Sequence, residues 1–379
     1  MTGKAFLWAA AVAAAGLAAA AGAPRASAED LVIGEIGSLT GPAAAFDKSV
    51  VDGVAAEIKD WNNRGGFKGG KVTIELLDDG SNAVDAVTVY RKLAQDKRIN
   101  VVIGASPSPS LLAMKAVSDE FAIPTIGTAT VAQLGKPAAK YFFRALPSTE
   151  DYMSGLVHWV KAHGYHTLAI LNPSGATGQS EATLLKKLAP AAGLKIVAAE
   201  TYNDSDTNFT AQLVNIRNAK PDFFYCGIIG GPSVTIFKQL KQLRLTMPVA
   251  IHSSSFNPAF YAGIGGIAQA EGVYTPIERG ALASSASGLT LDLFKRASAI
   301  LGHPATNLNT AGWDTAMMVE HAIETSDGTR DGIRNAMEAT KDLPVIGGVM
   351  SYAPDDHGGK DERSIGIGRM VGGRIVEAK

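Results

Sequence analysis

The stretch Val101-Val102-Ile103-Gly104-Ala105-Ser106-Pro107-Ser108-Pro109-Ser110 holds the pattern that decides the fold. It opens with a β-branched run, which is typical of a strand buried on both faces. A loop rich in serine and proline comes next, and residues 110–121 then carry apolar side chains at helical spacing. A strand, a loop and a helix in this order form one unit of a parallel sheet with crossover helices.

The same unit recurs along the chain. Further strands are predicted at 31–34, 72–77, 123–126, 167–171, 195–200, 223–227 and 249–252, with helices at 49–62, 83–95, 152–161, 181–191, 210–218 and 233–243. After a Gly/Ala/Ser-rich passage at 263–288, helices are predicted at 289–301, 312–325 and 330–339, and strands at 348–352 and 365–376. Because a chain of this length exceeds one usual core, the pattern predicts two α/β lobes, each a Rossmann-like, doubly wound sheet.

The N-terminus has the features of a secretory signal peptide over residues 1–28. Lys4 precedes an apolar, alanine-rich run at 5–21, and Ala26-Ser27-Ala28 supplies the small residues of a cleavage site. A retained membrane anchor is the alternative, but the run is short and rich in alanine, which disfavours it. Since no cysteine lies at the cleavage site, we expect a periplasmic protein that is not a lipoprotein and does not insert into the membrane after cleavage.

The charges of the chain nearly balance, with 35 Lys and Arg against 36 Asp and Glu and a formal net charge of −1. This balance provides no electrostatic footprint for nucleic acid or an anionic membrane, so neither is expected as a partner. Cys226 is the only cysteine, so no internal disulfide can form. Because it falls in a predicted strand, we expect an inert core thiol.

No motif in the sequence indicates catalysis. Residues 65–71 spell G-x-x-x-x-G-K, but Val72 stands where a phosphate-binding loop needs Ser or Thr. The stretch also comes after a helix and precedes a strand, which is the reverse of the order that such a loop needs. The seven histidines show no spacing typical of metal ligands. We therefore expect no enzyme, no metal and no cofactor.

Three longer runs carry a family resemblance. They are Gly34-Glu35-Ile36-Gly37-Ser38-Leu39-Thr40-Gly41-Pro42, Ile58-Lys59-Asp60-Trp61-Asn62-Asn63-Arg64-Gly65-Gly66 and Gly69-Gly70-Lys71-Val72-Thr73-Ile74-Glu75-Leu76-Leu77-Asp78-Asp79. In order and spacing they resemble the opening of the periplasmic Leu/Ile/Val-binding protein family, the type I substrate-binding proteins of ABC importers. Shorter matches at 102–106, 123–126, 129–130 and 143–144 extend the resemblance over nearly the whole mature chain.

The resemblance implies a Venus-flytrap architecture, in which a hinge of three strands joins the two lobes. It assigns residues 31–147 plus 277–350 to the first lobe and residues 148–276 plus 351–379 to the second. It also implies a small-molecule ligand and, as partners, the membrane permease subunits of a branched-chain amino acid-type ABC importer. We expect the protein to be a monomer.

Two loops at the carboxyl ends of predicted strands are candidates for binding an anion. One contains Ser106 and Ser108, and the other contains Thr128, Ala129 and Thr130. Hydroxyl groups and the free N–H groups of helix N-termini suit a carboxylate, and the resemblance implies that these loops hold the carboxylate of the ligand. The alternative is that the hydroxyl groups only cap helices.

The second lobe departs from the family pattern. The resemblance implies an acidic residue after the strand at 249–252 in relatives that bind the ammonium group of an amino acid, whereas this chain has His252-Ser253-Ser254-Ser255. No Asp or Glu occurs between Asp222 and Glu271 or in the loop at 172–178. Because a buried ammonium without a carboxylate partner is costly, we expect an aromatic or aliphatic acid without an α-amino group. His252, Ser253 and Ser254 would contact its far end.

Other interpretations stay open at this point. Asp47 leaves a route for binding an ammonium group, so a branched-chain amino acid or an amide is the alternative ligand. The resemblance gives Phe46 the role of an apolar wall, although a core or surface phenylalanine is the alternative, and Ile229 stands where relatives have a tyrosine over the ligand. Three function classes remain: a transport binding protein, a ligand-sensing receptor subunit, and a hydrolase without a visible motif. Fold analogy and site chemistry favour the first.

Overall fold

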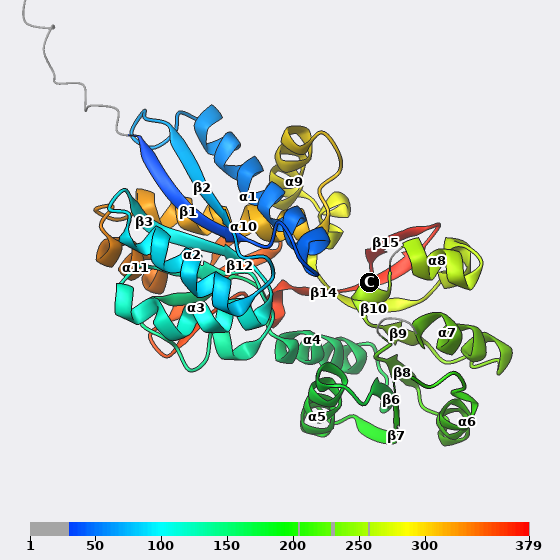
Figure 1. Cartoon of the computed structure of the whole chain (residues 1–379). Coiled ribbons are helices and arrows are strands. Elements are labelled where there is room, and N and C mark those ends of the chain that lie inside the picture. Colours follow the sequence, from blue (N-terminus) through cyan, green and yellow to red (C-terminus); the bar gives the residue numbers. More distant parts are fainter. Residues whose placement is uncertain (1–29, 204, 229–231, 257, 379) are drawn as a thin grey trace, which may run out of the picture.

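Two lobes lie side by side in the computed structural model, which describes residues 30–378 apart from 204, 229–231 and 257 (Figure 1). The predicted signal peptide and Ile229 therefore lie outside the described residues. Among the helices of the described part, none combines the length and the apolar character that a membrane span requires. Each lobe is built around its own sheet, which confirms the predicted fold class.

The first lobe contains five parallel strands in the order β2-β1-β3-β4-β5. They are β1 (Leu31–Gly37), β2 (Val72–Asp78), β3 (Ile99–Ala105), β4 (Thr125–Gly127) and β5 (Phe142–Arg144). The helices around them are α1 (Ala44–Asn63), α2 (Ala83–Gln95), α3 (Ser108–Phe121), α9 (Gly288–Leu301), α10 (Asn307–Glu324) and α11 (Arg330–Ala339). Val101 and Ile103 pack with α1, α10 and α11, whereas Val102 packs with α2 and α3, because side chains alternate along a strand. Helices thus cover both faces of the sheet.

The second lobe contains seven strands in the order β15-β14-β10-β9-β8-β6-β7. They are β6 (Thr167–Pro173), β7 (Lys195–Tyr202), β8 (Phe223–Cys226), β9 (Val249–Ile251), β10 (Tyr274–Glu278), β14 (Ile365–Val371) and β15 (Arg374–Glu377). The helices are α4 (Thr149–Ala162), α5 (Ala176–Ala191), α6 (Thr210–Ala219), α7 (Pro232–Gln242) and α8 (Pro258–Ile264). The first five strands from β7 to β10 are parallel, and β14 and β15 extend the sheet antiparallel. Cys226 is buried in β8, as expected.

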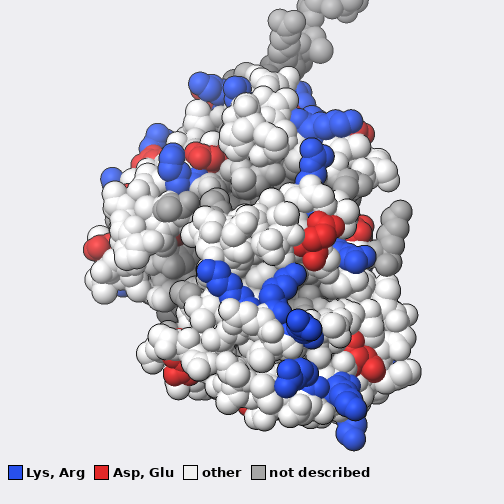
Figure 2. All heavy atoms as spheres, turned by 90° about the vertical axis from the view of Figure 1, so that its right-hand side faces the viewer, with Lys and Arg blue, Asp and Glu red and all other residues white. Residues whose placement is uncertain are grey.

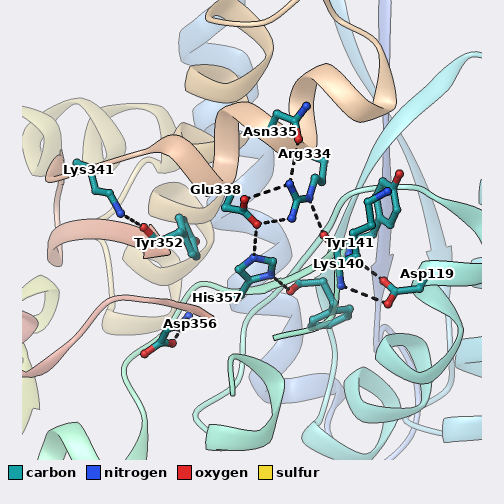
Figure 3. A network of polar contacts seen from close by, with 12 residues as sticks. Asp119, Lys140, Tyr141, Arg334, Asn335, Glu338, Lys341, Tyr352, Asp356 and His357 are labelled. Atoms are coloured by element: carbon teal, nitrogen blue, oxygen red, sulfur yellow. Dashed lines mark hydrogen bonds and ion pairs between the residues drawn. The ribbon is translucent and has the colours of Figure 1, made fainter. Parts of the chain in front are cut away.

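A small antiparallel sheet attaches the late part of the chain to the first lobe. It consists of β11 (Leu343–Val345), β12 (Gly348–Ala353) and β13 (Asp356–Gly359). His357 is buried and stacks on Phe143 with a centroid distance of 4.0 Å. Its Nδ1 lies 2.8 Å from the carbonyl of Phe142 and its Nε2 lies 3.1 Å from Glu338 (Figure 3). These contacts hold residues 351–359, which the resemblance assigned to the second lobe, against the first.

The chain passes between the lobes three times, at residues 145–148, 278–279 and 360–364. Lys360 is buried there, and its Nζ lies 2.7 Å from Oδ2 of Asp314 in α10 and 3.6 Å from Oε2 of Glu278 in β10. The hydroxyl of Tyr152 in α4 donates to Glu278 at 2.8 Å. A buried polar chain therefore links groups from both lobes at the hinge.

On the face drawn in Figure 2, basic and acidic side chains are interspersed within a larger uncharged area. Residues 65–71 form the turn from α1 to β2 and border an open hollow of about 740 Å³ together with Lys59 and Asn62. Because this turn lies after a helix and before a strand, it has the reverse order of a phosphate-binding loop.

Candidate functional site

The two hydroxyl-rich loops of the first lobe are neighbours, because β3 and β4 pair in parallel with Ile103 opposite Ile126 and Gly104 opposite Gly127. The hydroxyl of Ser106 is buried and donates to the carbonyl of Ile36 at 3.4 Å. These loops thus start from the same edge of the sheet, the edge at which ligands of parallel α/β sheets usually bind.

Neither loop caps a helix with its hydroxyl groups, which was the alternative to a role in ligand binding. α3 begins at Ser108 after Pro107, and no side chain caps it. Thr128 donates its hydroxyl to the carbonyl of Gly104 at 3.1 Å. A carboxylate bound here would therefore have to draw the hydroxyl of Thr128 away from a backbone carbonyl.

The second loop leads into a different element from the one predicted. We expected a helix after Thr128, Ala129 and Thr130, and the structure has only the short 3-10 helix η1 (Ala132–Leu134) before β5. The cis peptide between Lys136 and Pro137 lies in the same connection. The second loop consequently offers backbone N–H groups of a turn, without the dipole of a full helix.

Ser110 is a candidate donor that the sequence pattern alone did not single out. It lies in the first turn of α3, is fully buried, and its hydroxyl has no hydrogen-bond partner among the described residues. Buried hydroxyl groups normally have a partner, so this one is available to an incoming acceptor. The one sequence signal for Ser110 as a donor was its place in the serine-rich stretch 106–110.

Phe46 and Asp47, both in the first turn of α1, have opposite environments. Phe46 is 57% exposed, whereas Asp47 is buried near Ser38 and Asp79. Burial, against the effect of Ser38 and with a smaller contribution from the nearby Asp79, raises the pKa of Asp47 to about 6. Ser38 itself donates to Asp79 at 2.6 Å. Phe46 is exposed enough to be a surface residue, and its role as an apolar wall stays a prediction.

In the second lobe, the predicted contact residues come directly after β9. His252 precedes the 3-10 helix η2 (Ser253–Ser255), and its side chain is 27% exposed. The backbone N–H of Ser254 donates to Nδ1 of His252 at 3.1 Å, and the hydroxyl of Ser254 lies 2.7 Å from the same nitrogen. Ser255 is buried and donates to the carbonyl of Ile228 at 2.5 Å. His252, Ser253 and Ser254 therefore form one compact group, and Ser255 fastens it to the loop after β8.

A buried acid, Glu181, lies beneath this group. Its Oε2 accepts hydrogen bonds from Nδ2 of Asn172 at 2.9 Å and from the hydroxyl of Tyr225 at 3.0 Å. Its Oε1 lies 3.4 Å from Nε2 of His252. Asn172 is in β6, Tyr225 in β8 and His252 after β9, so three neighbouring strands converge on one carboxyl group.

The environment shifts the acid–base behaviour of both groups. Burial raises the pKa of Glu181 to about 7, and the hydrogen bonds from Tyr225 and Asn172 oppose that rise. Burial lowers the pKa of His252 to about 4. The imidazole is consequently neutral at pH 7, and the carboxyl group titrates near neutrality.

Glu181 was not predicted as a site residue, because the acid was sought in the loop at 172–178 and the next helix was expected to begin at Glu181. The helix in fact begins at Ala176, so Glu181 lies in its second turn and faces the sheet. Leu185 and Ala189, four and eight residues further, are both fully buried. The sequence signal that could have identified Glu181 is an acidic residue on the otherwise apolar face of a helix.

No group of three or more His, Cys, Asp or Glu in the described part of the chain is arranged to hold a metal ion. The candidate site combines hydrogen-bond donors in the first lobe with a buried acid and its neutral partners in the second.

Comparisons with known proteins agree with this architecture. A family model described as periplasmic binding protein matches residues 30–367. The Leu/Ile/Val-binding protein BraC3 of Rhizobium johnstonii is 26% identical over 358 residues, which cover 92% of this chain and 94% of that protein. The leucine-, isoleucine-, valine-, threonine-, and alanine-binding protein of Pseudomonas aeruginosa is 27% identical over 222 residues, or 58% of this chain and 59% of that one.

Among solved structures, an ABC transporter substrate-binding protein from Desulfitobacterium hafniense in complex with Leu has a TM-score of 0.75 at 18% identity, covering 92% of this chain and 100% of that chain. A substrate-binding protein from Sphaerobacter thermophilus has a TM-score of 0.77 at 17% identity, covering 93% and 97%. At these identities the likeness concerns the fold.

Proposed function

We propose that this chain, which belongs to the periplasmic binding protein family, captures a small carboxylate between its lobes and delivers it to the permease subunits of an ABC importer. The family consists of periplasmic solute-binding proteins, and the two curated relatives are named for branched-chain and other amino acids. The protein binds its ligand without changing it chemically.

The observation that carries the proposal is the pairing of β3 with β4, which brings two donor-rich loops to one sheet edge. Ser106, Ser108, Thr128, Ala129 and Thr130 lie in these loops, and Ser110 adds a buried hydroxyl without a partner among the described residues. A carboxylate would accept a hydrogen bond from Ser110 and draw the hydroxyls of Ser106 and Thr128 away from the backbone carbonyls to which they donate. The head group of the ligand binds there.

The far end of the ligand lacks an α-amino group in this proposal. His252, Ser253 and Ser254 are neutral side chains at the carboxyl end of β9. An aromatic or aliphatic acid fits such a surface, whereas an ammonium group needs a carboxylate in contact. Phe46 and, outside the described residues, Ile229 would add apolar surface.

A branched-chain amino acid is the second candidate, and two buried acids favour it. Glu181 lies beneath His252, and Asp47 lies in the first turn of α1. The names of the relatives also favour an amino acid. In either case the lobes close over the ligand by bending at the three crossings, and the ligand shifts the protein toward the closed form that it binds better.

A ligand screen tests the proposal and separates the two candidates. We would measure the melting temperature and binding heat of the mature chain with benzoate, butyrate, leucine and leucinamide. Binding stabilises the folded state by about 2.7 kcal/mol when the ligand is at one hundred times its Kd. We expect a rise in melting temperature with the two acids, and their recovery unchanged by mass spectrometry.

Variants sharpen the same screen. Ser110→Ala should weaken carboxylate binding severalfold, whereas Asn335→Ala, an exposed position on α11, serves as the matched control. Tight leucine binding without any response to benzoate or butyrate would select the amino acid candidate. If none of the four compounds binds, a carboxylate ligand of this size is refuted.

A further inference from the structure

A cavity of about 220 Å³ lies in the first lobe between α1, α9 and α10, bordered by Leu343 of β11. α1 packs on both helices (Figure 1). Near the end of α1, Asn62 exchanges two hydrogen bonds of 2.8 Å with Val72, the first residue of β2. This end of α1 therefore lies at the amino edge of the sheet, whereas the ligand loops follow β3 and β4 at the carboxyl edge. Glu57, in the cavity wall, lies about 15 Å along the helix axis from Asp47.

Two buried polar groups of the cavity wall lack a partner. Trp313 in α10 is fully buried, and its indole N–H has no hydrogen-bond partner among the described residues. The side chain of Glu57 is 1% exposed, and its Oε1 accepts a hydrogen bond from Arg64 at 3.0 Å. Its Oε2 is buried and has no partner within the same part of the chain. Because buried polar groups normally have partners, the wall offers one donor and one acceptor to a guest.

The polar side of the cavity carries more negative than positive charge. The carboxyl groups of Glu57, Asp60, Glu320 and Glu324 share the guanidinium groups of Arg64 and Arg296, and His321 completes the polar wall. Arg64 contacts Glu320 with both terminal nitrogens, at 2.6 and 2.7 Å. Arg296 contacts Asp60. Both cations are thus already paired, and the excess of acids favours a positively charged guest.

Glu57 is the acid at which such a guest is best placed. Burial, and then the neighbouring Glu320, raise the pKa of Glu57 well above its usual value, against the effects of Arg64 and Arg296. Two neighbouring carboxyl groups can share one proton, or they can share a cation. An ammonium group has three N–H donors, so it can serve Oε2 of Glu57 and Glu320 together.

We propose that this cavity binds a small amino alcohol, whose ammonium group contacts Glu57 and Glu320 and whose hydroxyl oxygen accepts the indole N–H of Trp313. The short hydrocarbon chain between the two groups lies against Leu293 and Met317, which also line the cavity. The volume is below the roughly 300–1,000 Å³ of drug-sized pockets, so the guest has only a few heavy atoms. The cavity lies away from the ligand loops, and the proposal goes beyond the function proposed above.

Nitrogen-15 NMR of the mature chain in phosphate buffer tests the proposal at the cavity itself. The indole N–H resonance of Trp313 is identified by its loss in Trp313→Phe. Ethanolamine and 3-amino-1-propanol carry both polar groups, ethylamine lacks the hydroxyl and ethylene glycol lacks the ammonium. We expect one of the amino alcohols to shift the Trp313 resonance with a Kd of about 1 mM, as befits so small a ligand. It should bind at least about fivefold tighter than ethylamine or ethylene glycol, because each lacks one hydrogen-bonding group.

Variants assign the two contacts. Their binding is followed through the indole N–H of Trp61, which donates to Glu324 in the cavity wall at 3.1 Å. Glu57→Gln should weaken the amino alcohol at least about tenfold, since a hydrogen bond to a charged group is lost. Trp313→Phe should bring ethylamine and the amino alcohol within about twofold of each other, because only the hydroxyl contact is removed. Asp52→Asn, which replaces an exposed acid on the same helix, is the matched control and should change neither affinity.

The ligand series in the unmodified protein keeps the proposal falsifiable even if a variant fails to fold. Ethylamine binding as tightly as both amino alcohols would remove the hydroxyl contact and overturn the proposal. No shift of the Trp313 resonance with any of the compounds would mean that Glu57 and Glu320 share a proton and need no guest, which also overturns it. Full affinity in Glu57→Gln would do the same. Because carboxylate binding is measured separately with benzoate and butyrate, either proposal can fail without the other.

Discussion

Glu181 shows how one buried acidic side chain can lower the stability of a fold. Its carboxyl group is almost fully buried, and no Lys or Arg among the described residues pairs with it. Ionising such a group in the folded protein is unfavourable compared with ionising it in the unfolded chain. The residue therefore lowers the stability of the fold wherever it is ionised.

The sign of this effect gives a prediction for Glu181→Gln. The pKa is about 7 in the folded protein against 4.5 in the unfolded chain. The folded state thus holds the proton more tightly, so the free energy of unfolding falls as the pH rises from about 4.5 to 7. A shift of that size corresponds to at most about 3 kcal/mol. Glutamine cannot ionise, so the variant should gain stability relative to the unmodified protein over this range.

Urea denaturation at about pH 5 and about pH 8 measures the difference. Tyr225, whose own pKa is raised by burial and by Glu181, stays protonated throughout, and His252 stays neutral above its pKa of about 4. Glu150→Gln, which replaces an exposed acid on α4, is the control. A stability difference for Glu181→Gln that is the same at both would contradict the assigned pKa.

Among single residues, the sequence identified only part of the candidate site. The loops with Ser106 and Thr128 were predictable, because hydroxyl groups after a β-branched run mark the end of a parallel strand. Glu181 was not, because its contact with His252 joins residues 71 positions apart through the pairing of strands. Local spacing cannot report which strands become neighbours.

Among the helices and strands, the alternation was predicted correctly, and the ends of the elements were less accurate. α10 begins at Asn307, five residues before the predicted start, because Thr306 and Asn309 form a capping box that the apolar pattern does not contain. Asp314 therefore lies within the helix and not in its first turn. There it faces Lys360, for which no role was predicted.

The packing of α1 on α10 leads to a prediction about glycine. A β-carbon on Gly312 would lie 2.0 Å from the carbonyl oxygen of Val50, and one on Gly53 would lie 2.1 Å from that of Asn309. The two helices thus touch through their backbones at two glycines. Gly312→Ala must push them apart, which should lower the free energy of unfolding by about 1–3 kcal/mol despite the better helix propensity of alanine.

Thermal or urea denaturation measures this change, with Asn335→Ala on the exposed side of α11 as the control. A Gly312→Ala protein as stable as the unmodified one would mean that the contact between the helices relaxes without cost. Because α1 also carries Asp47 at its start, we expect the variant to weaken ligand binding as well.

Across the molecule as a whole, the lobes are joined by the buried chain from Tyr152 through Glu278 and Lys360 to Asp314. Asp314 also accepts the backbone N–H groups of Ile346 and Gly347, both at 2.8 Å. Tyr152 belongs to the second lobe and Asp314 to the first, whereas Glu278 and Lys360 lie on the crossings themselves. The hinge is consequently an ionic centre in which each charge has a partner.

Removing the cation from this centre should destabilise the protein strongly. Lys360→Met keeps the length of the side chain but leaves Asp314 and Glu278 buried without their positive partner, which costs about 3–5 kcal/mol when a buried pair is broken in this way. Arg363→Met, an exposed residue three positions further that pairs with Asp342 and Asp361, should cost less than about 1 kcal/mol. Urea denaturation of both variants gives the comparison.

Because Lys360 and Glu278 connect the lobes, Lys360→Met should also change the rate of ligand-induced closure in stopped-flow fluorescence, whereas Arg363→Met should not. Equal, small effects of the two substitutions on stability would show that the buried centre contributes no more than a surface ion pair.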